Sequence, residues 1–297
     1  MRVAITGSHG LIGSALASSL TRDGHDVVRV VRGNPGANEV QWDPLAGTVA
    51  PDAFNGVDAV VHLAGEGVAE KRWTDAQRAK VLDSRRAGTD AVARACAAAK
   101  NGPPVLVSGS AIGFYGDTHG EVVDESAGPG DDFLASVCRT WEAATEPAEA
   151  AGLRVVHART AIVQTASGGM LGKQLLPFKL GLGGRLGSGK QWVSWISLED
   201  EVRAIRFAID NNTLRGPVNL SAPESVTNAQ YTKALGQVLH RPAALIVPPF
   251  ALKAALGSEL VESLLVSQRV APKKLLDAGF VFSHPTIVEG LRTAVGG

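Results

Sequence analysis

The sequence contains very little cysteine. Cys96 and Cys138 are the only two cysteines in 297 residues, and both lie in helix-like stretches without any paired spacing. Two such residues cannot form a disulfide framework, and they offer no cysteine-based metal site. We therefore predict a protein without a bound metal that suits a reducing compartment.

The chain also lacks an excess of charge and a long apolar run. Lys+Arg and Asp+Glu number 29 each, whereas proteins that bind nucleic acid or anionic membranes usually have a basic surplus. No apolar run reaches the roughly 18 residues that cross a bilayer, and the start MRVAITGSHG has no signal-peptide pattern. We expect a cytoplasmic protein whose partner is a small molecule, not nucleic acid or a membrane.

Short runs rich in β-branched residues are present, and most precede a helix-like stretch. A helical pattern follows RVAIT, DAVVHLAG, PVLVSGS and LRVVHART, whereas a loop follows DVVRVV. The runs AVVHLA and PVLVS are apolar without alternation, which is typical of strands buried on both faces. Strands that alternate with helices form covered parallel sheets. The sequence thus predicts an α/β fold with a Rossmann-type, doubly wound parallel sheet.

The pattern loosens after about residue 160. Eight glycines lie between residues 168 and 189, in a segment that reads as a helix, a glycine-rich hairpin and a short strand. This segment could be a mobile flap or substrate wall, or its glycines could only satisfy turns with positive φ. We predict a Rossmann domain over residues 1–165, which also receives elements from about 190–225, and a smaller, mainly helical lobe within 166–297.

The first predicted strand ends in TGSHGLIG, where Gly7, Gly10 and Gly13 are three residues apart. Between a strand and a helix, the first glycine permits a sharp turn and the second lets the backbone approach a pyrophosphate. The third lets the helix pack closely on the sheet. The amides of Leu11 and Ile12 would face the phosphates at the positive end of the helix. These five residues predict a dinucleotide site.

The second strand bears on the choice of cofactor. An NAD site favours an acidic residue at the carboxyl end of this strand, whereas DVVRVVRGN ends in Arg32 and carries Asp26 at its opposite end. Arg32 therefore indicates a 2′-phosphate, and so NADP or NADPH. The alternative is that Arg32 is a solvated charge at a strand end.

Further residues are expected to line the cofactor cleft. A predicted strand ends in HLAGE, so that Leu63, Ala64 and Gly65 would lie against the adenosine or ribose and Glu66 would face the pocket. Glu66 could equally cap a helix. His9, inside the glycine loop, could contact phosphate or only shape the turn.

The chain resembles the extended short-chain dehydrogenase/reductase family over roughly its first 220 residues, in TGSHGLIG, VVHLAG, SRRAGT (84–89) and VSGSAIGFYG (107–116). It is similar to one atypical branch in SRRAGT, SGSAIGFYGD, FLASVCRTWE and the tail SQRVAPKKLLDAGFVFSHPTIVEGL. That branch comprises epimerase-family proteins, or predicted nucleoside-diphosphate-sugar epimerases, with a C-terminal segment of unknown function.

The resemblance implies an acid-base site. Family members use a serine after the fifth strand, and a tyrosine on the next long helix with a lysine four residues later, on the same helix face. Ser110 matches the serine. Leu134 and Cys138 stand where the tyrosine and lysine belong, and neither of the two tyrosines, Tyr115 and Tyr231, has a lysine four residues later. The resemblance therefore implies a member without the usual pair.

Tyr115 is the best substitute for the missing tyrosine. It follows Ser110 by five residues, in a loop at the carboxyl ends of the strands, where open α/β sheets bind ligands. Its phenol could act as a general acid if the cofactor or Arg85 lowered its pKa, or it could only pack against the nicotinamide or substrate. Four secondary candidates are Arg85, Glu66, Asp117 and His119. Arg159, at the end of LRVVHART, could clamp a phosphate or carboxylate, although a structural ion pair is the favoured alternative.

Two functions remain open at this point. The first is an NADP-dependent oxidoreductase or epimerase that acts on a small polar substrate, with Ser110 and Tyr115 as catalytic candidates and Arg85 among the cofactor contacts. The second is a non-catalytic sensor or regulator that binds NADP(H), which the missing tyrosine and lysine favour. We expect a monomer or a homodimer.

Overall fold

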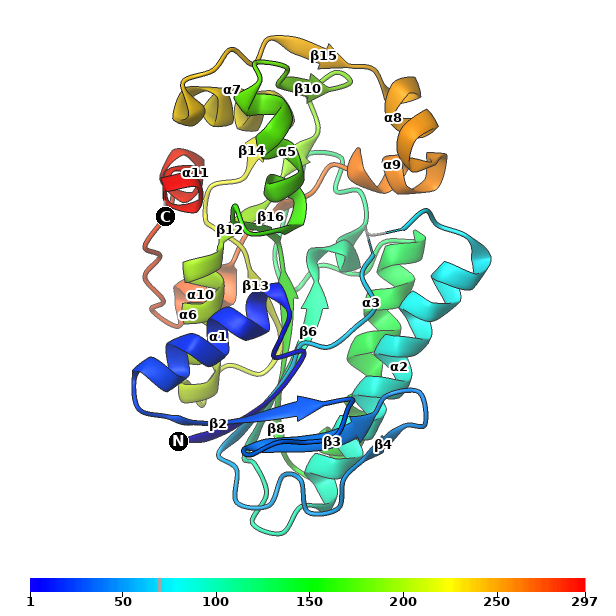
Figure 1. Cartoon of the computed structure of the whole chain (residues 1–297), viewed down its shortest axis with the longest axis vertical. Coiled ribbons are helices and arrows are strands. Elements are labelled where there is room, and N and C mark those ends of the chain that lie inside the picture. Colours follow the sequence, from blue (N-terminus) through cyan, green and yellow to red (C-terminus); the bar gives the residue numbers. More distant parts are fainter. Residues whose placement is uncertain (69–70, 297) are drawn as a thin grey trace.

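The computed structural model describes residues 1–68 and 71–296, so Gly297, the last residue of the predicted lobe, lies outside the described residues. Its centre is one sheet of eight strands, β1 (Arg2–Thr6), β2 (Asp26–Val31), β3 (Glu39–Asp43), β4 (Thr48–Val49), β5 (Ala59–His62), β6 (Val105–Ala111), β8 (Arg154–Thr160) and β13 (Gly216–Leu220). The strand order is β13-β8-β6-β5-β1-β2-β3-β4, and all neighbours are parallel except β3 and β4. The predicted Rossmann-type α/β fold is confirmed (Figure 1).

The order of the strands locates the ligand crevice. From β1, the chain adds β2 and β3 on one side and later adds β5, β6, β8 and β13 on the other. The order therefore reverses between β1 and β5. In open α/β sheets, ligands bind at the carboxyl ends of the strands beside such a reversal.

The loop predicted after DVVRVV is wrong, because this stretch contains β3 and β4. β3 extends the sheet by pairing with β2, and it buries Trp42, whose ring stands edge-on to His62 with centroids 5.9 Å apart. The apolar signal of EVQWD is short and is flanked by glycine, proline and asparagine. Burial against a neighbouring strand, which the local pattern does not record, decides this element.

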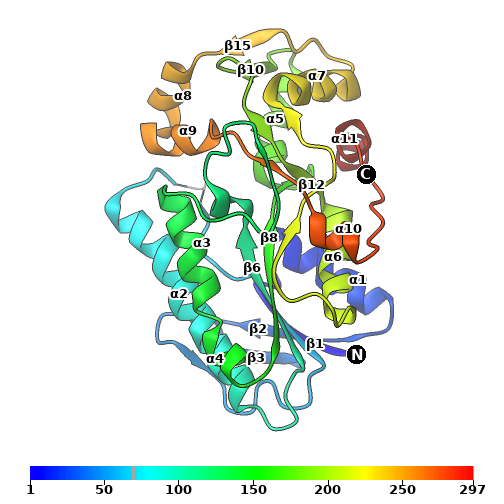
Figure 2. The ribbon, with the colours of Figure 1, turned by 180° about the vertical axis from the view of Figure 1, so that it is seen from behind.

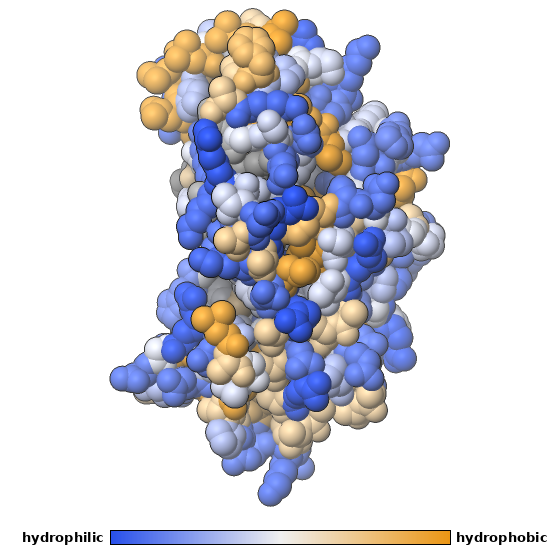
Figure 3. Space-filling model, turned by 90° about the vertical axis from the view of Figure 1, so that its right-hand side faces the viewer, coloured by the Kyte–Doolittle hydropathy of each residue, from blue (hydrophilic) through white to orange (hydrophobic). Residues whose placement is uncertain are grey.

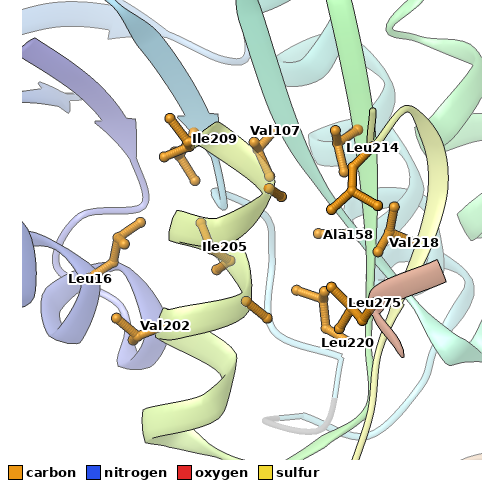
Figure 4. Packing of buried hydrophobic residues seen from close by; sticks show 14 of the residues in the cluster. Leu16, Val107, Ala158, Val202, Ile205, Ile209, Leu214, Val218, Leu220 and Leu275 are labelled. Atoms are coloured by element: carbon orange, nitrogen blue, oxygen red, sulfur yellow. The ribbon is translucent and has the colours of Figure 1, made fainter. Parts of the chain in front are cut away.

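Helices cover both faces of the sheet (Figure 2). One face carries α1 (Leu11–Arg22), α6 (Leu198–Asp210) and α10 (Lys273–Asp277), and the other carries α2 (Asp75–Ala98), α3 (Phe133–Ala143) and α4 (Glu146–Ala150). Figure 4 shows the core on the first face, where Leu16 of α1 and Val202 of α6 lie beside each other above the sheet. Each buried aliphatic side chain there contributes about 1.5–3 kcal/mol, so this packing fixes the start of α1 relative to the strands.

A smaller lobe stands beyond the carboxyl ends of the strands (Figure 1). Its helices are α5 (Gly169–Lys179), α7 (Asn228–Leu239), α8 (Pro249–Leu256), α9 (Ser258–Leu264) and α11 (Ile287–Gly296). Its strands form short pairs: β9 (Ile162–Gln164) with β12 (Trp195–Ser197), β11 (Trp192–Val193) with β14 (Val226–Thr227), and β10 (Gly184–Leu186) with β15 (Leu245–Val247).

The predicted glycine-rich hairpin is wrong. β10 pairs in parallel with β15, some sixty positions later in the chain, and a parallel pair cannot be a hairpin. A Cβ on Gly184 would lie 2.6 Å from the Leu245 carbonyl oxygen, so glycine permits this close approach of the two strands. Gly181, Gly187 and Gly189 have positive φ, as the turn interpretation expects.

The carboxyl-terminal region returns to the large domain. β16 (Arg269–Val270) pairs in parallel with β7 (Val122–Val123). Gln268 Nε2 donates to the carbonyl oxygens of Ile112 and Gly116, both at 3.2 Å. These bonds hold the short helix η1 (Ile112–Tyr115), which follows β6. Within residues 1–68 and 71–296, no helix has the length and apolar character that crossing a membrane requires.

Candidate functional site

The glycine turn between β1 and α1 has the geometry that its spacing predicts. Gly7 has a φ of +66°, and a Cβ there would lie 2.8 Å from the Leu63 carbonyl carbon. A Cβ on Gly13 would lie 2.2 Å from the Gly7 oxygen. α1 then begins after Gly10 with no side-chain cap and no acidic residue in its first turn. Its first amides are therefore available to an anion.

A hydroxyl-imidazole chain ties this turn to the neighbouring strand end. Thr6 Oγ1 accepts from the amides of Leu63 (3.1 Å) and Ala64 (3.3 Å) and lies 2.7 Å from His62 Nδ1. Burial lowers the pKa of His62 to about 3, so the ring is neutral. Thr6 then donates to Nδ1, and His62 Nε2 donates to Thr89 Oγ1 at 3.0 Å. This chain fixes the strand ends on both sides of the crevice.

Basic side chains of the second strand lie next to the turn. Arg32 directly follows β2 and is exposed, whereas Asp26 lies at the opposite end, in an ion pair with Arg2 at 3.3 Å. Arg29, on the same strand, donates from Nη1 to the carbonyl oxygen of Ser8 at 3.0 Å. The carboxyl end of β2 therefore presents positive charge beside the loop.

His9 is exposed at the edge of a depression of about 560 Å³ beside the turn. Gly10, Leu11 and Ser14 line one side of it, and Ser167 and Gly168 line the other. A Cβ on Gly168 would lie 3.3 Å from Leu11 Cδ1. The start of the glycine-rich segment thus lies against the start of α1.

The loop after β5 rests on a buried arginine. Arg85 Nη1 donates to the carbonyl oxygens of Glu66 (2.9 Å) and Val81 (3.1 Å), and its guanidinium lies 4.7 Å from the centroid of the Trp141 ring. Burial lowers the pKa of Arg85. A Cβ on Gly65 would lie 3.3 Å from Arg85 Cζ. Arg85 therefore packs against the backbone of residues 63–66 and holds it in place.

Glu66 is bound by a residue of α2 and by a lysine in the segment that precedes this helix. Its carboxylate accepts from Gln77 Nε2 at 3.2 Å and lies 3.5 Å from Lys71 Nζ. The hydrogen bond from Gln77 is the main cause that lowers the pKa of Glu66, and Lys71 adds to it. Thr74, not Glu66, caps α2.

Ser110 donates its proton to a carboxylate. Its Oγ lies 2.7 Å from Glu142 Oε1 on α3. Glu142 is also paired with Arg159 through two bonds of 2.8 Å, from Nε to Oε1 and from Nη2 to Oε2. The side chain of Arg159 is only 4% exposed. Arg159 therefore forms the structural ion pair that the sequence left as an alternative.

Tyr115 belongs to the same buried network. Its hydroxyl donates to Asn219 Oδ1 at 2.7 Å and accepts from Arg159 Nη1 at 2.9 Å. Burial raises the pKa of Tyr115, which opposes the lowering by Arg159. Tyr115 is 5% exposed, so its hydroxyl is held inside the protein by Asn219 and Arg159.

Leu134 and Cys138 do lie beside the loop that follows Ser110. A Cβ on Gly113 would meet Leu134 Cβ at 3.5 Å and Cys138 Sγ at 3.8 Å. The thiol donates to the Ala111 carbonyl oxygen at 3.6 Å. Burial raises the pKa of Cys138 to about 12. Leu134 and Cys138 therefore pack against the loop that follows β6, and burial keeps the Cys138 thiol protonated.

Two secondary candidates do not join this cluster. Asp117 and His119 form an exposed pair, with His119 Nδ1 3.6 Å from the carboxylate and the histidine side chain 85% exposed. Among the residues that the structure describes, no group of three or more His, Cys, Asp or Glu side chains could hold a metal ion.

The sequence did not single out four residues of the site: Thr6, Arg29, Glu142 and Asn219. Arg29 could have been found from the alternation in DVVRVV, because Val28 and Val30 point to the opposite face. Glu142 directly follows the apolar stripe of α3, which places a carboxylate beside the buried face. No local signal marks Asn219, since its hydrogen-bond partners lie 52, 94 or 104 residues away.

The glycine turn at the reversal of strand order defines a dinucleotide-binding protein of the Rossmann type. A family model described as the NAD dependent epimerase/dehydratase family matches residues 3–220. A second one, described as Domain of unknown function (DUF1731), matches residues 247–294. The chain belongs to the NAD dependent epimerase/dehydratase family. The resemblance seen in the sequence, including its C-terminal segment of unknown function, is confirmed.

Relatives are similar over nearly the whole chain. An epimerase family protein of Mycobacterium bovis is 48% identical over 97% of this chain and 96% of its own length. The crystal structure of human epimerase family protein SDR39U1 (isoform 2) with NADPH superposes with a TM-score of 0.91 at 34% identity, covering 100% of this chain and 99% of that one. A nucleoside-diphosphate sugar epimerase from Corynebacterium glutamicum has a TM-score of 0.81 at 37% identity, covering 99% and 59%.

Proposed function

We propose that the protein binds NADPH in the crevice between β1 and β5. The observation that carries this proposal is the glycine turn, where a Cβ on Gly7 or Gly13 would strike backbone atoms and the amides of α1 have no cap. The similarity to human SDR39U1, which was solved with NADPH, supports it. The proposed contacts are Gly7, His9, Gly10, Leu11, Ile12, Gly13, Arg32, Leu63, Ala64, Gly65 and Glu66, with Arg85 beneath them.

The residues present fit such a cofactor. The turn and the positive end of α1 would bind the pyrophosphate. Arg32 would bind the 2′-phosphate, since charge-assisted contacts from arginine suit phosphate oxygens. When bound, the nicotinamide supplies or accepts a hydride. An oxidoreductase or a sugar-nucleotide epimerase-like enzyme that acts on a small polar substrate follows from this chemistry, and a cytoplasmic location stays a prediction.

We infer that Ser110 handles the substrate proton without the usual tyrosine and lysine. Ser110 donates its own proton to Glu142, so the lone pairs of its Oγ can accept a hydrogen bond from a substrate hydroxyl. When an alcohol is oxidised, its proton would pass to Ser110 Oγ as the serine proton passes to Glu142. Arg159 holds the carboxylate in place through two bonds. This arrangement favours removing a proton from an alcohol over giving one to a carbonyl.

Titration of the purified protein with NADPH and NADH, followed by nucleotide fluorescence or calorimetry, tests the cofactor. We expect at least about tenfold tighter binding of NADPH, because a charge-assisted bond contributes about 1.5–3 kcal/mol. Arg32→Glu should remove this preference and leave NADH binding nearly unchanged. Arg292→Glu on α11, the same charge change on an exposed residue of the small lobe, is the control. Equal affinities in the unchanged protein would contradict NADPH as the cofactor.

The proton role of Ser110 has a separate test. A panel of polar alcohols with NADP, and of carbonyl compounds with NADPH, measures turnover. Ser110→Ala should lower kcat about 100-fold or more, within the range for loss of a proton-transfer group, while NADPH affinity stays the same. Turnover that survives in Ser110→Ala would remove the serine from this role.

A second candidate function, a non-catalytic NADP(H) sensor, is favoured by one observation. The hydroxyls of Ser110 and Tyr115 both already have hydrogen-bond partners in a buried network. NADPH binding without turnover on either panel, together with a nucleotide-dependent change in protease sensitivity, would support the sensor over the enzyme.

A further inference from the structure

Charge is unevenly distributed along this neutral chain. Residues 161–198 and 225–258 carry seven Lys and Arg side chains and no Asp or Glu, although Asp and Glu make up 29 of the 297 residues. These two segments include α5, β10, α7, β15 and α8. In Figure 1 and Figure 2, β10, α7, β15 and α8 lie at the end of the small lobe farthest from the central sheet, and α5 runs from beside the glycine turn toward that end. The neutral total, from which we expected no membrane partner, therefore hides a basic region.

Two stretches at this end, residues 176–186 and 241–253, form a surface that we call the lobe tip. β10 pairs with β15, and Arg241 Nε donates to the Lys179 carbonyl oxygen at 3.0 Å, which holds the stretches together. A Cβ on Gly181 would lie 3.5 Å from Pro242 Cγ. The two stretches thus make one continuous surface.

The lobe tip exposes a large apolar area. It holds six of the eleven large apolar side chains exposed in the described part of the chain: Leu176 (67%), Leu180 (65%), Leu182 (59%), Leu245 (49%), Ile246 (54%) and Phe250 (76%). Figure 3 shows apolar side chains gathered at the top of the molecule, where Figure 1 places β15 and α8. Apolar patches on the order of several hundred Å² usually mark an interaction site.

Basic side chains accompany these apolar groups. Lys179 lies beside Leu180 at the end of α5, and Arg185 is the register partner of Ile246. No ion pair among residues 1–68 and 71–296 involves Lys179, Arg185 or Arg241. The first acidic residues after this region are already engaged: Glu259 lies 3.1 Å from Arg78 and Glu262 lies 2.7 Å from Lys253. The tip therefore keeps the positive charges of Lys179, Arg185 and Arg241, whereas Lys253 at its edge is paired with Glu262.

We propose that the lobe tip docks the protein on an anionic lipid bilayer. Leucine, isoleucine and phenylalanine together with lysine and arginine are the composition of surfaces that insert into the headgroup region, where each basic residue adds to the attraction. A second copy is disfavoured, because a symmetric contact would bring like charges together. A protein partner is less favoured, because the tip has no tryptophan, tyrosine or methionine and contains lysine, which protein interfaces deplete, although its phenylalanine and arginine suit either kind of partner.

Docking at the tip is independent of the proposed cofactor site. The glycine turn lies on the sheet side of the molecule, and the tip lies at the other end of the small lobe (Figure 1). A variant of the tip should therefore leave NADPH affinity unchanged. This separation makes a failure of membrane docking distinguishable from a failure of the proposed function.

Co-sedimentation of the whole chain with vesicles tests the proposal. We expect binding to phosphatidylcholine vesicles that contain phosphatidylserine, no binding to phosphatidylcholine alone, and a decrease as salt is raised. Lys179→Gln should weaken binding about fivefold. Phe250→Ser should weaken it about tenfold or more, because the inserted ring is lost.

Matched controls lie far from the tip. Leu45, which is 90% exposed in the turn between β3 and β4, and Lys100 after α2 are exposed residues of the same kinds. Leu45→Ser and Lys100→Gln should bind vesicles as the unchanged protein does. Three results would overturn the proposal: no binding to anionic vesicles at low salt, equal loss in the controls, or concentration-dependent dimerisation that Phe250→Ser abolishes.

Discussion

The two sides of the crevice are built in different ways. On the β1 side, the glycine turn consists of backbone, and its three glycines lie within seven positions of one another, although Gly7 also approaches the backbone of Leu63. On the α3 side, five polar side chains from five separate segments form one buried network: Ser110, Tyr115, Glu142, Arg159 and Asn219. The chain thus keeps the glycine turn that suits a dinucleotide. On the α3 side it has a polar network whose members come together only in the folded protein.

This difference predicts which substitutions should destabilise each side of the crevice. The turn depends on the absence of side chains, so added atoms are harmful there. The network depends on complete pairing, because a buried charge without a partner costs several kcal/mol. Three predictions test this contrast and a fourth tests a separate buried carboxyl, in order of decreasing effect.

Removing the central carboxylate should have the largest effect. Glu142→Ala leaves the guanidinium of Arg159 buried without its counter-ion, so the free energy of unfolding should fall by about 3–5 kcal/mol. Urea unfolding measures this. Asp90→Ala, which breaks an exposed ion pair with Arg94 on α2, is the control and should leave stability nearly unchanged. A similar small loss for both variants would show that the network contributes no more than surface pairs.

A pH dependence should come from a second buried carboxyl. Glu201 on α6 accepts from Thr160 at 2.8 Å, and burial raises its pKa from 4.5 to about 8. The folded protein holds this proton where the unfolded chain releases it. The contribution of Glu201 to stability is therefore fully present below pH 4.5 and is lost as pH rises toward about 8, by at most about 1.4 kcal/mol per pH unit. Thermal unfolding of Glu201→Gln across this range should lack the decline, and an identical decline in the variant would assign it to another group.

Adding one methyl group to the turn should have the next largest effect. In Gly13→Ala the new Cβ would lie 2.2 Å from the Gly7 oxygen, so the helix start must shift, at a cost of about 1–3 kcal/mol. NADPH affinity should fall with it, as calorimetry would show. Gly128→Ala, where nothing lies within 4 Å of the added Cβ, should bind NADPH normally. Unchanged binding by Gly13→Ala would show that the turn does not hold the cofactor.

The smallest effect is expected at Tyr115. Tyr115→Phe removes the hydroxyl between Asn219 and Arg159, which should lower the free energy of unfolding by about 1–2 kcal/mol. Any turnover found for the unchanged protein should persist within about twofold, because the buried hydroxyl is engaged by Asn219 and Arg159 and we expect it to exchange no proton. Stability and kcat measured on the same sample decide this. A large loss of kcat without a loss of stability would return Tyr115 to the role of general acid.

The sequence predicted the parts of this protein that depend on neighbouring residues. The spacing of apolar residues, together with the glycines and prolines that separate the segments, predicted the alternating strands and helices. The glycine spacing predicted the turn after β1. Comparison with the family's motifs identified Ser110 and the missing tyrosine and lysine. The sequence missed β3 and β4 and misread β10 as part of a hairpin, because a strand is decided by its pairing partner, and β15 lies some sixty residues from β10.

The sequence by itself determined the Rossmann-type fold and the loop that suits a dinucleotide, because a glycine's backbone freedom and an apolar period are properties of short segments. Only the tertiary structure decided that Ser110 points to Glu142, that Tyr115 is buried between Arg159 and Asn219, and that the basic and apolar residues of the lobe tip share one surface. Hydrogen bonds and ion pairs need partners within about 3–4 Å, and the fold brings such partners together from distant positions in the chain.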